Sequence, residues 1–133
     1  MFRIKYCREI VLKMLYQLDV LQPNDEEKQQ ILRDNLDFFK GLNPREIKFV
    51  TDMLDKVQQE KEKIDEMIAK NLIGWKLERL MLIDRNLLRM GIAESYFNDQ
   101  KAIIIDDVVR IAKKYGGEES YKIINAILDR VLL

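Results

Sequence analysis

With 133 residues and a mass of 15.9 kDa, the chain fits a single domain, and its 47% hydrophobic and 35% charged residues exclude a membrane span and a low-complexity tail. The absence of histidine and the single cysteine exclude histidine-containing metal sites and Ser-His or Cys-His nucleophile pairs, so we expect no catalysis, no cofactor and no metal ion. Because 23 basic residues balance 23 acidic ones, the zero net charge excludes the strongly basic class of nucleic-acid binder, while only 5 glycines and 2 prolines favour helices over a sheet.

The first predicted helix begins at Ile4 and ends before Pro23, because apolar residues recur between them at three- and four-residue steps. The opening residues lack the apolar run of a signal peptide, so we expect a cytoplasmic protein. The cations of this helix suit an RNA phosphate backbone as well as a solvated face, and Tyr16 suits base stacking as well as the edge of a core. These cations are Arg3, Lys5, Arg8 and Lys13.

Two capping patterns predict the next two helices. Asn24 followed by Glu27 marks the start of a second helix, which is expected to stop at Gly41. Asn43, a first-turn proline and Glu46 form the strongest helix start of the chain and open a long third helix. Its charged middle, KVQQEKEK, predicts a stretch that lies in water.

A break at Asn71 and Gly74 ends the third helix. Gly74 is the expected boundary between subdomains 1–73 and 74–133 of one domain, and Trp75 is the expected packing anchor between them. Later apolar stripes predict a short turn at 75–80 and helices at 83–97, 104–115 and 124–131, with Gly116 and Gly117 capping the second of these helices. The predicted fold is all-α, with about seven helices in two small packed bundles.

A polar cluster surrounds the Gly116-Gly117 turn. Two lysines precede the turn, and a lysine, an amide and a carboxylate follow it at helical spacing, opposite the apolar face of the last helix. Cations, an amide and a turn with exposed backbone groups suit phosphates and base edges of RNA, although a solvated polar face is the simpler interpretation. The cluster consists of Lys113, Lys114, Lys122, Asn125 and Asp129.

Four segments carry a resemblance that covers nearly the whole chain. They are Arg8-Glu9 with Leu15-Tyr16; Trp75, Leu77, Glu78-Arg79-Leu80, Ile83-Asp84-Arg85 and Leu88-Arg89; Ala112-Lys113-Lys114-Tyr115-Gly116-Gly117; and Ser120-Tyr121-Lys122 with Asn125 and Leu128-Asp129. In these segments the chain resembles the NusB family of transcription antitermination factors. The resemblance implies an all-helical, non-enzymatic protein that binds the boxA element of nascent ribosomal RNA operon transcripts together with the ribosomal protein NusE. It also implies an indirect partnership with RNA polymerase, which then reads through terminators.

The resemblance also implies two binding surfaces. One, facing NusE, lies near Asp84 and Arg85 and takes in Glu78 of the same central pattern. The other, facing RNA, lies on the N-terminal arm and on the turn before the last helix, and Tyr16 is added to it as a stacking candidate. The RNA surface comprises Arg3, Lys5, Arg8, Tyr16, Lys113, Lys114, Glu119, Lys122 and Asn125.

The chain departs from the family pattern at four points. The basic arm is reduced to three spaced cations, Asp106 stands where an asparagine is usual, Ile123 stands where an aromatic residue is expected, and the proline usual near Gln100 is missing. We therefore expect weaker RNA affinity in the absence of NusE.

Two other functions remain open from the sequence. A helical adaptor that binds a protein partner without RNA is favoured by the thin basic arm and the zero net charge. The RNA-guiding domain of a ribosomal RNA methyltransferase shares the helical fold, but this sequence has no cofactor-binding glycine loop, so that function would need a separate partner domain. A monomer and a homodimer paired through the first helix are equally compatible with the sequence.

Overall fold

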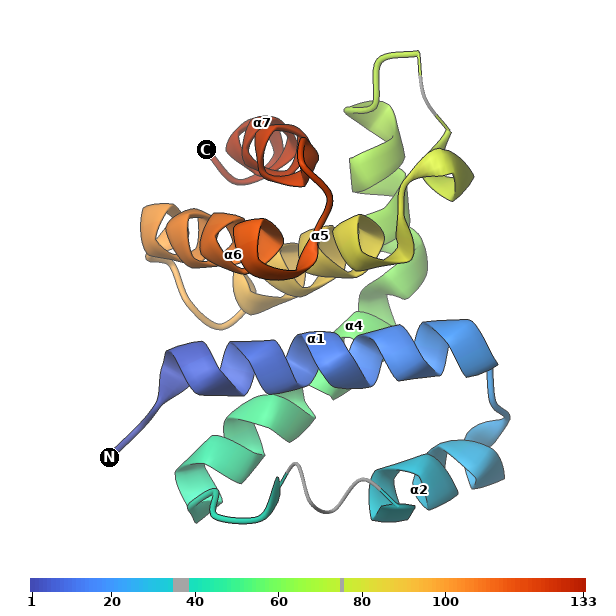
Figure 1. The fold of residues 1–133 in the computed structure, drawn as a ribbon, viewed down its shortest axis with the longest axis vertical. Helices are drawn as coiled ribbons and strands as arrows, with labels where there is room; N and C mark the ends of the chain where they lie inside the picture. The colour runs from blue at the N-terminus through green and yellow to red at the C-terminus, as the bar shows by residue number, and fades with distance from the viewer. Residues whose placement is uncertain (35–38, 75) are drawn as a thin grey trace.

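The computed structural model describes residues 1–34, 39–74 and 76–133. Over these residues the chain forms six α-helices and one 3-10 turn and contains no strand, which confirms the predicted all-α class (Figure 1). The elements are α1 (Ile4–Leu21), α2 (Asp25–Asp34), α4 (Pro44–Lys70), η1 (Leu77–Arg79), α5 (Leu82–Glu94), α6 (Lys101–Tyr115) and α7 (Ser120–Leu132).

Both predicted capping boxes are present. Asn24 Oδ1 accepts a hydrogen bond from the Glu27 amide at 2.8 Å, and Glu27 Oε1 accepts one from the Asn24 amide at 3.2 Å. At the start of α4, Asn43 and Glu46 make the same reciprocal pair at 2.9 and 3.0 Å. Each pair satisfies backbone N–H groups that have no partner inside the helix, so the sequence determines where these helices begin.

Two predictions fall on residues outside the described ranges. The continuation of the second helix to Gly41 crosses residues 35–38. The expected packing anchor between the subdomains, Trp75, also lies outside the described residues.

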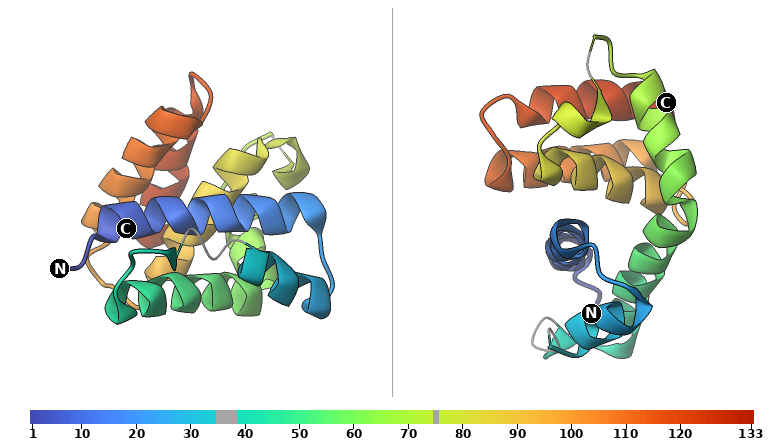
Figure 2. Two further views of the ribbon diagram at one scale, coloured as in Figure 1. Left: turned by 60° about the horizontal axis from the view of Figure 1, so that its bottom comes forward. Right: turned by 90° about the vertical axis from the view of Figure 1, so that its right-hand side faces the viewer.

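The helices form two groups joined by α4 (Figures 1 and 2). α5, α6 and α7 lie on one side of α1, α2 lies on the other side, and α4 runs behind α1 from one group to the other. One continuous apolar core includes buried residues of α1, α4, α5, α6 and α7. Because α4 belongs to both groups, the subdomain limits at residues 73 and 74 remain a prediction. None of the described helices combines the length and the apolar composition needed to cross a membrane.

The turn between α6 and α7 begins at a glycine. Gly116 caps α6 as predicted, and its backbone is extended, with φ −85° and ψ −177°. A Cβ at Gly116 would lie 2.7 Å from the Ala112 carbonyl oxygen and 2.7 Å from Ser120 Cβ. Glycine is therefore required here by close packing rather than by an unusual φ.

Candidate RNA interface

The predicted RNA-binding residues lie on or directly before α1, α6 and α7. Figure 1 shows α6 between α1 and α7, so the three helices form one face, to which α6 contributes Lys113 and Lys114. Lys5 and Tyr16 are exposed on α1, and the remaining exposed candidates lie around the turn between α6 and α7. Those around the turn are Lys113, Lys114, Glu119, Lys122 and Asn125.

Two tyrosines gather four lysines on this face. The Nζ atoms of Lys13 and Lys114 lie 5.7 and 5.1 Å from the centre of the Tyr115 ring. The Nζ atoms of Lys113 and Lys122 lie 5.0 and 5.9 Å from the centre of the Tyr121 ring. Cations at these distances are attracted to the ring faces, so the tyrosines hold positive charge near the turn. We call Lys13, Lys113, Lys114 and Lys122 the lysine cluster.

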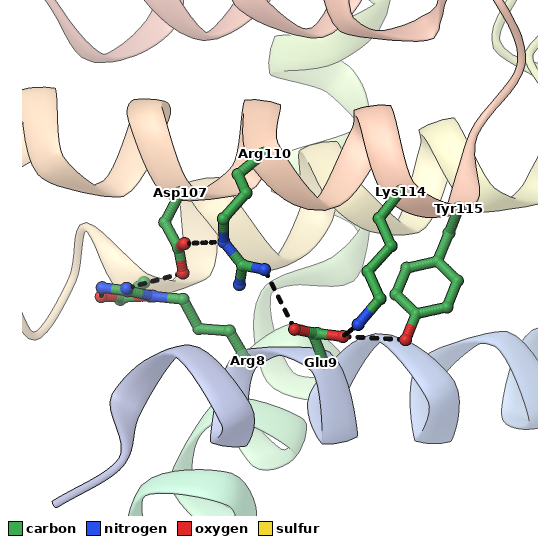
Figure 3. A network of polar contacts seen from close by, with 7 residues as sticks. Arg8, Glu9, Asp107, Arg110, Lys114 and Tyr115 are labelled. Atoms are coloured by element: carbon green, nitrogen blue, oxygen red, sulfur yellow. Dashed lines mark hydrogen bonds and ion pairs between the residues drawn. The ribbon is translucent and has the colours of Figure 1, made fainter.

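Glu9 connects α1 to α6 (Figure 3). Its carboxylate accepts hydrogen bonds from Lys114 Nζ at 2.8 Å, from the Tyr115 hydroxyl at 2.8 Å and from Arg110 Nη1 at 3.1 Å. Burial alone would raise the pKa of Glu9, but the hydrogen bonds from Lys114, Tyr115 and Arg110 outweigh it and lower this pKa to about 2. Glu9 is therefore an anion in the middle of a cationic face.

Arg8 does not reach this surface. Its side chain is 2% exposed, and its guanidinium donates to Glu94 at 2.7 and 2.6 Å and to Asp107 at 2.9 Å. Asp107 in turn accepts a 2.6 Å hydrogen bond from Arg110 Nε. A buried cation needs partners, and Arg8 finds them 86 and 99 residues away in the chain, so the structure places it away from the exposed surface and its contact with RNA stays a prediction.

Arg3 is exposed, but its guanidinium pairs with a carboxylate. Its Nε and Nη2 donate to Glu46 at 2.9 and 2.8 Å, and Nη2 also donates to the Gly41 carbonyl. The hydrogen bond from Arg3, followed by that from the Asn43 amide, lowers the pKa of Glu46 to about 2. Because Arg3 and Arg8 both pair with carboxylates, the free positive charge of the N-terminal arm is smaller than the sequence indicates.

The polar residues of α7 form weaker contacts. Lys122 lies 3.0 Å from Glu119, one turn away, and both side chains are more than half exposed. Asn125 Nδ2 donates to Asp129 at 3.4 Å. Exposed pairs of this kind contribute little to stability, so an incoming phosphate or base edge can replace them.

The three residues expected to face the protein partner occupy different environments. Glu78 is exposed in η1, whereas Arg85 Nη2 donates to the Leu80 carbonyl at 3.0 Å and to the Glu78 carbonyl at 3.4 Å, so it ties η1 to α5. Asp84 is buried, and burial raises its pKa against the opposing effect of the Ser120 hydroxyl. The structure thus places Asp84 inside the protein, and its contact with the partner stays a prediction. No group of three metal-ligating side chains occurs in the part of the chain that the structure describes.

Comparison with known sequences identifies close relatives. The family model described as "NusB family" matches residues 6–133. The transcription antitermination protein NusB of Myxococcus xanthus is 32% identical over 126 residues, which cover 93% of this chain and 90% of the relative. The protein of the same name from Acetivibrio thermocellus is 35% identical over 127 residues, covering 94% of this chain and 85% of the relative.

Solved structures share the fold over nearly the full length. The crystal form of T. maritima NusB superposes with a TM-score of 0.85 at 31% identity, covering 99% of this chain and 92% of that one. A structure of the antitermination factors NusB and NusE in complex with dsRNA also gives a TM-score of 0.85, at 26% identity, and covers 99% and 98% of the two chains. The match over residues 6–133 and these relatives show that the chain belongs to the NusB family.

Proposed function

We propose that the chain is a transcription antitermination factor. It binds boxA RNA of ribosomal RNA operon transcripts together with NusE and so promotes read-through by RNA polymerase. The observation that carries this proposal is the exposed lysine cluster, which lies on a fold that superposes on NusB in a complex with NusE and dsRNA. The role is binding rather than catalysis, and it belongs in the cytoplasm, where bacterial transcripts are made.

The face offers the three kinds of contact that RNA recognition uses. The lysines provide phosphate contacts, the exposed ring of Tyr16 provides a stacking surface, and the amide of Asn125 provides a donor and an acceptor for a base edge. Because the whole chain has no net charge, counterion release from its own contacts is modest. NusE therefore completes the positive groove and raises the affinity.

The test is a titration of labelled boxA RNA and of a scrambled RNA of equal length, with and without NusE, at two salt concentrations. We expect tighter binding of boxA, further tightening by NusE and weaker binding at the higher salt concentration. Equal affinity for the two RNAs in the presence of NusE would contradict the proposal.

A second function is favoured by a specific observation. Arg3, Lys114 and Lys122 each have a carboxylate partner, as an adaptor that binds a protein but not RNA would have. In the same titration the adaptor predicts binding of NusE without any selectivity for boxA.

A further inference from the structure

The contact between α1 and α6 concentrates hydrogen-bond donors around one carboxylate. Lys114 Nζ, the Tyr115 hydroxyl and Arg110 Nη1 all donate to Glu9, whose side chain is 14% exposed (Figure 3). Lys13 approaches the same tyrosine ring from α1. We call these residues, Glu9, Lys13, Arg110, Lys114 and Tyr115, the α1–α6 seam.

The seam has more donors than Glu9 uses. Arg110 Nη2 is buried and has no hydrogen-bond partner among the described residues, although an unpaired buried donor is costly. No carboxylate partner is found for Lys13 within the described ranges. Arg110 also lines a groove of about 400 Å³ together with Lys5 and Asp106, so the seam opens to the side on which the N-terminal arm lies.

The charges of the seam favour a second anion. The cations paired across the seam and below it are Arg8, Arg110 and Lys114, and their carboxylate partners are Glu9, Glu94 and Asp107, so these six charges cancel. Lys13, which lies against the Tyr115 ring, adds one further positive charge. Arg110 and Lys114 are 36% and 55% exposed, so an anion from solvent can reach both.

We propose that the α1–α6 seam is a binding site for one backbone phosphate of RNA and that the Glu9 carboxylate occupies it in the free protein. This inference rests on the proposed function and adds a contact to it. A phosphodiester carries one negative charge and two free oxygens, so it accepts the hydrogen bonds that Glu9 now accepts and adds one from Lys13. Moving the Glu9 carboxylate toward solvent offsets part of the free energy gained by binding the phosphate. Glu9 therefore lowers the affinity for RNA.

The decisive variant is Glu9→Gln, which keeps the size of the side chain and an oxygen acceptor but removes the competing charge. We expect its affinity for RNA to rise about three- to tenfold relative to the wild type. The slope of log affinity against log salt should stay the same, because the wild type and the variant contact the same phosphate and only the competing carboxylate is removed. Thermal unfolding followed by circular dichroism verifies that the variant is folded.

Two further variants make the result specific. Glu62→Gln changes the net charge equally at an exposed position of α4, and we expect its affinity to stay within about twofold of the wild type because screening weakens distant charges. Lys13→Gln removes an exposed cation of the seam, and it should lower the affinity and flatten the salt dependence. An equal gain from Glu62→Gln, no gain from Glu9→Gln, or no loss from Lys13→Gln would each overturn the assignment.

The measurement uses boxA RNA and an oligouridylate of the same length, each with and without NusE. Because the seam binds phosphate and not a base, the gain from Glu9→Gln should be the same on both RNAs. If the wild type shows no preference for boxA, the proposed function fails. The change in affinity for oligouridylate caused by Glu9→Gln still shows whether the seam binds a phosphate. A gain confined to boxA would overturn a phosphate site.

Discussion

Arg8 lies between two carboxylates in the interior, and its replacement should affect stability before it affects binding. Arg8→Ala leaves the buried Glu94 without its cation and leaves Asp107 with Arg110 alone, and breaking a buried pair typically costs about 3–5 kcal/mol. Urea unfolding measures this loss. Lys5→Ala, which removes an exposed cation of the same helix, is the matched control and should change the free energy of unfolding by about 0.5 kcal/mol or less. Normal stability with weak RNA binding in Arg8→Ala would return Arg8 to the RNA surface.

Replacement of Lys122 should affect binding and not stability, because its side chain is 59% exposed and its pair with Glu119 is weak. Lys122→Glu should reduce the affinity for boxA RNA roughly tenfold through the loss of a phosphate contact and the repulsion that replaces it. Filter binding measures the affinity, and the unfolding curve should be unchanged. Unaltered affinity would remove Lys122 from the interface.

At the scale of elements, the turn between α6 and α7 depends on one of its two glycines more than on the other. Gly116→Ala places a methyl group 2.7 Å from backbone and side-chain atoms, and such overpacking typically costs about 1–3 kcal/mol. Gly117→Ala is the natural control, because its nearest neighbour is the flexible Met81 side chain at 3.4 Å. Thermal unfolding should separate the two variants, and equal melting temperatures would refute the packing argument.

The start of α4 makes stability depend on acid pH. The pKa of Glu46 falls from its ordinary 4.5 to about 2, so its ionised form adds stability that is complete above about 4.5 and is lost as the pH falls toward 2. Glu46→Gln keeps the size of the capping side chain but does not titrate. The difference in free energy of unfolding between wild type and variant, measured in urea, should therefore shrink between pH 4.5 and 2. A constant difference would show that the charge of Glu46 contributes nothing.

Local chemistry explains which of these elements were predictable. Asn24 and Asn43 bind amides three residues away, so their helices could be located from the sequence. The burial of Arg8 depends on Glu94 and Asp107, which are distant in the chain, and no periodic pattern reveals such a pairing. The seam partners of Glu9 were missed for the same reason, since charged residues on two helices identify a contact only once the helices are docked.

At the scale of the whole molecule, the two groups of helices share one core. Buried residues of α1 and α4 belong to the same apolar cluster as those of α5, α6 and α7. We therefore expect unfolding in one cooperative transition, with equal midpoints by far-UV and near-UV circular dichroism and equal calorimetric and van't Hoff enthalpies. Two separated transitions would instead support independent subdomains divided near Gly74.

The alternating charges between α1 and α6 also fix how far one helix can slide along the other. In the observed register Arg8 meets Asp107 and Glu9 meets Arg110. A slip of one helical turn, about 5.4 Å, would bring Arg8 to Arg110 in one direction and Glu9 to Asp106 and Asp107 in the other. Either slip sets like charges against each other. The shifted registers of α1 against α6 are therefore destabilised even where their apolar contacts would tolerate the shift.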